Sequence, residues 1–188
     1  MELKDFFDKT YSEINDNIKF AEAKNAALIT LNSALIAACA DKIFDYDIRL
    51  CWRILVGFLV ISLMLPLIIS IFSFRATTGS ESCLVKKIYK VLNKMNTIER
   101  NRESYMYYAY IAKFFDQSTD EYLKNLKEKI GASGSDEKGL DLLAKQIIDL
   151  SNVAYSKFTL FNIAIKIECS SFVIGTIIAI ILLVSKIF

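Results

Sequence analysis

The sequence predicts an all-α membrane protein with about three membrane-spanning helices, two of which continue into a cytosolic helical bundle. Residues 54–74 carry no charge. As a helix they would reach roughly 30 Å, the thickness of a bilayer's hydrocarbon core. Two more uncharged stretches, 26–40 and 169–185, accompany it, and the chain has only one proline and six glycines to make turns. A buried helix of a soluble protein is the alternative for 54–74, but such helices are usually shorter and keep a polar edge.

The first helix is expected to run through residues 3–40. Its apolar and amide residues recur in alternating steps of four and three, at Phe7, Tyr11, Ile14, Ile18, Ala21, Asn25, Leu28, Asn32, Leu35 and Cys39. Residues 26–40 are short for a span, so Lys24 would have to reach out to the headgroups. The alternative is a short helix against a soluble core. Because a lipid-facing asparagine is costly, Asn25 and Asn32 should contact another helix.

The charges around the spans predict the orientation. A basic run, containing Lys86, Lys87, Lys90, Lys94, Arg100 and Arg102, follows the span at 54–74. Basic residues near span ends prefer the cytoplasm. We therefore expect the N-terminus and residues 75–167 in the cytosol, and the C-terminus on the external side of the membrane. Pro66 should kink its span unless neighbours satisfy the freed carbonyl.

The segment after the second span is predicted to form a helical hairpin. An amphipathic helix begins near Leu84, a tyrosine-rich cluster spans 105–115, and a helix covers Asp120–Ile130. The glycine- and serine-rich residues 131–139 would link it to an antiparallel helix. That helix carries a stripe at Leu140, Leu143, Ile147, Leu150, Ala154, Phe158, Phe161 and Ile165, and continues into a third span at 172–188. The expected domains are 1–74, 75–167 and 168–188.

Small residues mark a helix-contact face in the third span. Ser171, Gly175 and Ala179 follow one another at intervals of four, which places them on one side of a helix. Small residues at this spacing let two membrane helices approach closely. We expect these three residues, with Asn25 and Asn32, to make helix or oligomer contacts.

The composition gives little support for an enzyme. The chain has no histidine, so it lacks the commonest general base and metal ligand. Its four cysteines stand singly, without a C-x-x-C pair, and neither a Walker loop nor a G-x-G-x-x-G motif occurs. A net charge of +2 does not favour nucleic acid as a partner. We expect no catalytic residues, no metal and no cofactor.

Two polar groups could bind a ligand. Glu22, Lys24 and Asn25 lie where the first span begins, and a charge there can mark function. Interface anchoring with an interhelical hydrogen bond is the simpler explanation. The second group combines basic and aromatic side chains that could hold a phosphate and stack a base: Arg100, Arg102, Tyr105, Tyr108 and Lys113. Its alternative is ordinary cytosolic positive charge beside a tyrosine-rich core.

Two short motifs resemble a known family. The early motif is Glu22, Lys24, Asn25 and Ala26, and the late motif is Gln146, Leu150, Ser151, Lys157 and Phe158. Together they resemble the membrane-spanning effectors of Pycsar, the pyrimidine cyclase system for antiphage resistance. The resemblance covers most of the chain, including the tyrosine-rich helix between the motifs. Asn25 departs from the pattern, since an alanine often follows the lysine.

The resemblance implies a function. In this family a partner cyclase makes cyclic CMP or cyclic UMP, and the effector responds by impairing the inner membrane, which causes abortive infection. The chain has no separate β-rich nucleotide-binding domain, so the nucleotide would meet helices, between protomers of a homo-oligomer, or another protein would sense it. The ligand-binding candidates are Lys24, Arg100, Arg102, Tyr105, Lys113 and Lys157. A non-enzymatic membrane scaffold and a small constitutive pore are the alternatives.

Overall fold

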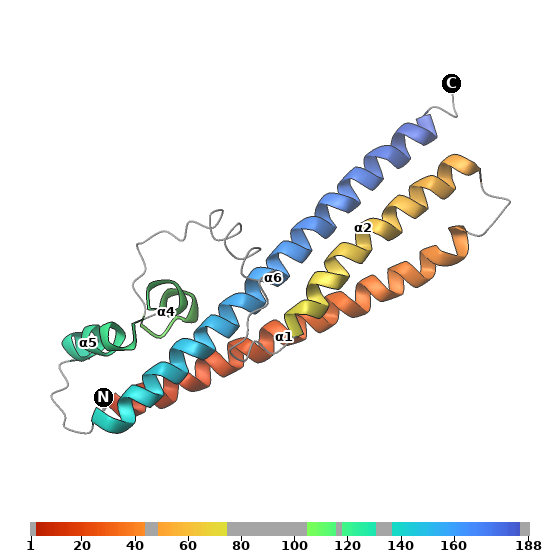
Figure 1. Cartoon of the computed structure of the whole chain (residues 1–188). Coiled ribbons are helices and arrows are strands. Elements are labelled where there is room, and N and C mark those ends of the chain that lie inside the picture. The colour runs from red at the N-terminus through yellow and green to blue at the C-terminus, as the bar shows by residue number, and fades with distance from the viewer. Residues whose placement is uncertain (1–2, 44–48, 75–104, 116–117, 131–136, 185–188) are drawn as a thin grey trace. The chain divides into compact units, whose positions relative to one another are not determined.

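The computed structural model describes residues 3–43, 49–74, 105–115, 118–130 and 137–184. Every element in these ranges is a helix (Figure 1). The elements are α1 (Leu3–Ile43), α2 (Leu50–Phe74), α4 (Tyr108–Phe114), α5 (Thr119–Ile130) and α6 (Glu137–Val184). The predicted helix near Leu84 and most of the predicted linker at 131–139 lie outside the described residues.

Three of these helices are long and apolar enough to cross a membrane. The qualifying segments are Leu3–Ala40 in α1, Leu50–Phe74 in α2 and Gly139–Val184 in α6. The predicted fold class, an all-α membrane protein with three apolar spans, is confirmed.

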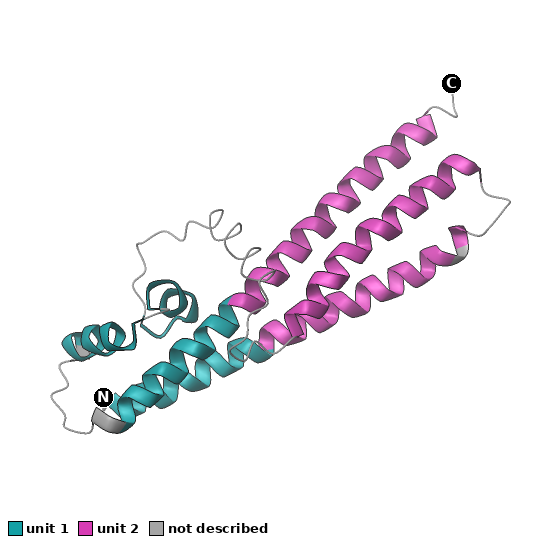
Figure 2. Ribbon diagram, in the orientation of Figure 1, with its two compact units in different colours: residues 1–19, 76–155 teal, residues 20–75, 156–188 magenta. Residues whose placement is uncertain are grey.

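The chain forms two compact units, each built from segments distant in sequence (Figure 2). Unit 1 contains residues 1–19 and 76–155, and unit 2 contains residues 20–75 and 156–188. Helices α1 and α6 each contribute residues to both units.

The repeating pattern of α1 identifies most of its buried face. Phe7, Ile14, Ala21 and Leu28 are buried, as are the two asparagines of the pattern. The expectation for Tyr11 was wrong, because this side chain is 37% exposed. Thr10 is buried in its place, and its hydroxyl donates to the Phe6 carbonyl at 2.8 Å. Alternating steps of three and four average 3.5 residues, whereas an α-helix has 3.6 residues per turn. The pattern therefore drifts around the helix, and some of its positions leave the buried face.

Helix α2 is polar inside and apolar outside, the reverse of a helix in a soluble protein. Its buried face contains Ser62, Leu63, Pro66, Ser70 and Ser73. Its exposed large side chains include Ile54, Phe58, Ile61, Met64, Leu65, Ile68, Ile71 and Phe72. Small and polar residues at helix contacts with large apolar residues facing outward are the pattern expected in lipid. The helix continues on both sides of Pro66.

Unit 1 has an aromatic core. Helices α4 and α5 contribute Tyr108, Ile111, Tyr122 and Leu126, and Phe115, the C-cap of α4, joins them. Helix α5 begins with a serine N-cap, since the backbone N–H of Glu121 donates to the Ser118 hydroxyl at 3.2 Å. The predicted helix over Asp120–Ile130 is therefore present, with Ser118 as its cap.

Candidate functional site

Lys157 of α6 connects the three helices of unit 2. Its side chain is only 8% exposed, and its ammonium donates to Glu22 Oε1 of α1 at 2.9 Å. The same ammonium donates to the Ser73 carbonyl of α2 at 3.1 Å. Ser73 lies in the last turn of α2, where carbonyls lack helical donors and a cation is favourable. One buried side chain thus caps α2 and pairs with α1.

Asn25 of α1 extends this arrangement. Its amide donates to the Ser73 hydroxyl at 3.0 Å and to the Ala21 carbonyl of its own helix at 2.9 Å. Ser73 therefore accepts from α1 through its hydroxyl and from α6 through its carbonyl. The Asn25 amide oxygen is buried and has no hydrogen-bond partner. We refer to Glu22, Asn25, Ser73 and Lys157 as the lysine layer.

A second polar contact lies further along the same helices. Asn32 of α1 donates to Glu168 Oε2 of α6 at 3.3 Å, and the two residues are 0% and 4% exposed. The Asn32 amide oxygen is buried and has no partner. Both residues lie roughly 15 Å beyond Glu22 and Lys157 along their helices. We refer to Asn32 and Glu168 as the glutamate layer.

Lys24 lies among three phenylalanine rings of unit 2. Its ammonium is 4.4 Å from the ring centroid of Phe20, 5.3 Å from that of Phe161 and 5.7 Å from that of Phe158. Aromatic faces stabilise a cation electrostatically. Lys24 therefore makes a second contact between α1 and α6.

The two motifs singled out in the sequence meet in unit 2. Glu22 and Lys24 of the early motif contact Lys157 and Phe158 of the late motif, and Glu22 and Lys157 are 135 positions apart. The remaining late residues belong to unit 1. There Gln146 is exposed and the buried Ser151 hydroxyl has no hydrogen-bond partner.

Gly175 lies where α6 approaches α2. It is buried, and a Cβ at this position would lie 3.6 Å from Leu59 Cδ1. Ser171 and Ala179 are half-buried, and the Ser171 hydroxyl donates to the Ile167 carbonyl of its own helix at 2.8 Å.

The predicted ligand-binding residues are distributed between the units. Lys24 and Lys157 belong to unit 2, whereas Tyr105 and Lys113 belong to unit 1. Arg100 and Arg102 lie outside the described residues. The Tyr105 ring lies in an aromatic cluster, with Lys129 Nζ 4.7 Å from its centroid, and its carbonyl accepts from the Tyr122 hydroxyl at 3.0 Å. The candidates Lys24, Lys157 and Tyr105 therefore already contact other residues of the protein.

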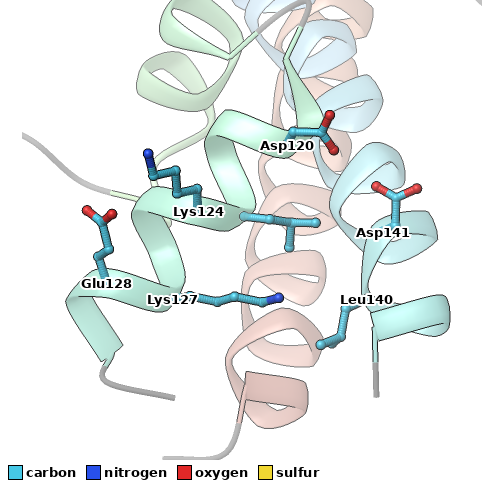
Figure 3. Close-up of a pocket in the computed structure, with 7 residues that line it drawn as sticks. Asp120, Lys124, Lys127, Glu128, Leu140 and Asp141 are labelled. Atoms are coloured by element: carbon cyan, nitrogen blue, oxygen red, sulfur yellow. The ribbon is translucent and has the colours of Figure 1, made fainter. Parts of the chain in front are cut away.

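Unit 1 contains a pocket of about 480 Å³ between α5 and the start of α6 (Figure 3). This size suits a small molecule. Its lining residues are Asp120, Leu123, Lys124, Lys127, Glu128, Leu140 and Asp141. Lys127 extends toward Leu140, whereas Lys124 and Glu128 point away from α6. Sequence reasoning missed this pocket, because its charged residues look like an ordinary solvated helix face.

A family model described as the Pycsar effector protein domain matches residues 6–186. The chain belongs to this family. The matched region includes both motifs, both polar layers and the pocket. Neither a curated protein nor a solved structure matches the chain. Family membership supports the predicted role as an effector of antiphage defence.

Glu168 is the residue of this Pycsar effector that sequence reasoning overlooked. It directly precedes the third uncharged stretch, so it looked like the polar boundary of a span. The predicted stripe on α6 passed through Phe158, Phe161 and Ile165, all half-buried. The buried positions in this part of α6 are Lys157, Ala164 and Glu168, so the contact face is rotated toward the polar residues. The spacing was the available signal: Ala164 follows Lys157 by seven positions and Glu168 follows Ala164 by four, which places all three on one face of a helix.

Proposed function

We propose that this Pycsar effector impairs the bacterial inner membrane in response to a cyclic pyrimidine nucleotide, cyclic CMP or cyclic UMP, and so causes abortive infection. The observation that carries this proposal is the buried contact of Lys157 with Glu22 and Ser73. Burying a charge among apolar helices is costly unless every partner stays in place. An ionisable side chain buried within a membrane-spanning unit is a candidate functional contact.

The rearrangement would start in unit 1. A ligand shifts a conformational equilibrium only by binding one arrangement better than the other. Because α1 and α6 each contribute to both units, a nucleotide that repositions either helix in unit 1 would change the contacts of the same helix in unit 2. Separation of Lys157 from Ser73 would leave a helix end and an ammonium that water must solvate. The three helices that meet at the lysine layer would then shift relative to one another and change how unit 2 packs in the membrane.

The pocket in unit 1 is the proposed place for the nucleotide. Its size accommodates a small molecule, and the Lys127 ammonium can meet the negative charge of a cyclic phosphodiester. The carboxylates of Asp120 and Asp141 can accept from the exocyclic amine of cytosine or the ring N–H of uracil. Arg100, Arg102, Tyr105 and Lys113 remain proposed contributors from the sequence.

The proposed topology follows the charges of the sequence. The N-terminus and residues 76–155 would be cytosolic, where a cyclase product accumulates, and the C-terminus would be external. Helix α6 would then enter the membrane before residue 168, earlier than the sequence predicts. We propose that the effector acts without catalysis or cofactor and as a homo-oligomer.

Membrane potential in bacteria tests this function. The effector is expressed with an active pyrimidine cyclase or with a catalytically inactive one, and a potential-sensitive dye is read in both. We expect depolarisation with the active cyclase alone. Depolarisation in both cultures would indicate a constitutive pore, and an unchanged potential in both would indicate a scaffold. Either result would overturn the proposal. Lys145→Met, which removes an exposed lysine of α6, should respond like the wild type.

A further inference from the structure

Helix α6 has a second polar face, opposite the one that meets α1 and α2. Asn162, Lys166 and Ser170 follow at intervals of four and are all exposed. At 100° per residue this face lies on the other side of α6 from Lys157, Ala164 and Glu168. The Ser170 hydroxyl donates to the Lys166 carbonyl at 2.8 Å. Within the described part of the chain, no hydrogen bond or ion pair is seen for the side chains of Asn162 and Lys166. We call Asn162, Lys166 and Ser170 the outer polar face.

The contacts inside unit 2 fix the depth of this face. Lys157 meets Ser73, and Gly175 meets Leu59, so α6 and α2 run antiparallel. Lys166 is halfway between the two α6 positions, and Pro66 is halfway between the two α2 positions. Lys166 is therefore level with Pro66, roughly 12 Å along the helix from Phe74.

This depth lies inside the uncharged stretch of α2. At the same level α2 exposes Leu65 and Ile68, which require lipid around them. A charged side chain at a helix centre in the hydrocarbon is costly to insert. Such residues almost always face a protein interior or a water-filled cavity. One copy of the chain leaves Lys166 exposed. Further copies must therefore form the rest of the wall of the water-filled cavity that Lys166 faces.

We propose that the outer polar face lines an aqueous path through assembled copies of this chain, and that the path conducts small inorganic anions such as chloride. The single charged side chain on the face is the cation Lys166, and a ring of cations in a pore selects anions. Helix α1 exposes small residues at a similar depth, among them Ala26, Thr30, Ser33 and Ala37. They would let neighbouring copies pack closely. This proposal rests on the proposed membrane impairment and specifies its pathway.

Reversal potentials in planar bilayers test the proposal. The full-length protein is reconstituted, cyclic CMP or cyclic UMP is added on the side of unit 1, and current is recorded across a KCl gradient. The wild type and Lys166→Arg should show an anion-selective reversal potential. Lys166→Glu should reverse its sign, whereas Lys145→Glu, a matched exposed lysine of α6, should leave it unchanged. An equal reversal potential in the wild type and Lys166→Glu would overturn the proposal.

A second variant covers the case in which Lys166→Glu does not insert. Asn162→Cys, in a background whose four native cysteines are alanine, is treated with a negatively charged thiosulfonate. We expect the current to fall, because the modified side chain lies in the path. An unaltered current would contradict the assignment. If the wild type carries no current with either nucleotide, the proposed function fails, and the proposed pathway fails with it. If the wild type carries current whose ion selectivity does not depend on Lys166, only the proposed pathway fails.

Discussion

Lys157 donates to the Ser73 carbonyl, 84 positions earlier in the chain, and this contact is more deeply buried than the ion pair that accompanies it. The Glu22 side chain is 44% exposed, so water can solvate its carboxylate if the lysine leaves. The Ser73 carbonyl, at the end of a helix, has no such alternative. The carbonyl contact should therefore contribute more to stability than the ion pair.

Replacing Lys157 with methionine, which has similar shape, should destabilise the protein by about 1–3 kcal/mol, because it leaves a buried carbonyl unsatisfied. The variant should also lose membrane impairment in cells. Thermal unfolding in detergent and the potential-sensitive dye give the two readouts. Glu22→Gln is the control, and it should cost about 0–1 kcal/mol, as expected for a half-exposed ion pair. Equal losses in the two variants would show that the ion pair dominates.

The glutamate layer should be sensitive to which partner is removed. Asn32→Leu leaves the Glu168 carboxyl group without its amide donor, and a buried group that loses its hydrogen-bond partner costs about 1–3 kcal/mol. Asn32→Leu combined with Glu168→Leu should recover most of that loss, because two apolar side chains then face each other. Unfolding in denaturant measures the stability of the wild type, of Asn32→Leu, of Glu168→Leu and of the double variant. Additive losses would contradict a direct coupling between the two residues.

Gly175 should tolerate a methyl group but no larger side chain. A Cβ there would lie at ordinary contact distance from Leu59, so Gly175→Ala should stabilise the helix by up to about 1 kcal/mol. Gly175→Leu should force α6 away from α2 at a cost of about 1–3 kcal/mol. We expect it to insert normally and to lose toxicity, as shown by membrane fractionation and growth assays. Undiminished toxicity of Gly175→Leu would discard the close approach as a functional contact.

The aromatic core of unit 1 should fail at alkaline pH. Burial, and then the nearby Tyr105, raise the pKa of Tyr122 well above its ordinary value of 10.0. A group with a raised native pKa contributes stability below its unfolded pKa and loses it as the pH rises toward the native value. Tyr122→Phe should cost about 1 kcal/mol at neutral pH, since the Tyr105 carbonyl loses its donor. It should also flatten the decline in stability above pH 10. An unchanged alkaline slope in near-ultraviolet circular dichroism would assign the decline to other groups.

Periodicity and charge were sufficient to predict the fold class and the three apolar spans. Uncharged length predicted the three spans, because a bilayer imposes one thickness on every helix that crosses it. The repeating pattern identified Asn25 and Asn32 as inward-facing, since a buried amide needs a partner. The pattern could not name that partner, because Ser73 and Glu168 lie on other helices. A local repeat shows which face of a helix is buried, but not which distant residue it contacts.

The site was less predictable than the fold. Lys157 was selected as a ligand residue from its motif, yet its ammonium is occupied by Glu22 and Ser73. A motif indicates that a side chain matters, but not whether it contacts a ligand or another helix. Tyr105 shows the same limit, since stacking on a base and packing in an aromatic core require the same residue type.

Dye release from proteoliposomes tests the central claim, that a cyclic pyrimidine nucleotide opens the membrane through unit 2. Vesicles containing the wild type should release a small anionic dye when cyclic CMP or cyclic UMP is added, and should retain it with cyclic AMP. Vesicles containing Lys157→Met should retain the dye with every nucleotide. Release that occurs equally without nucleotide, or no release with either pyrimidine nucleotide, would contradict the account.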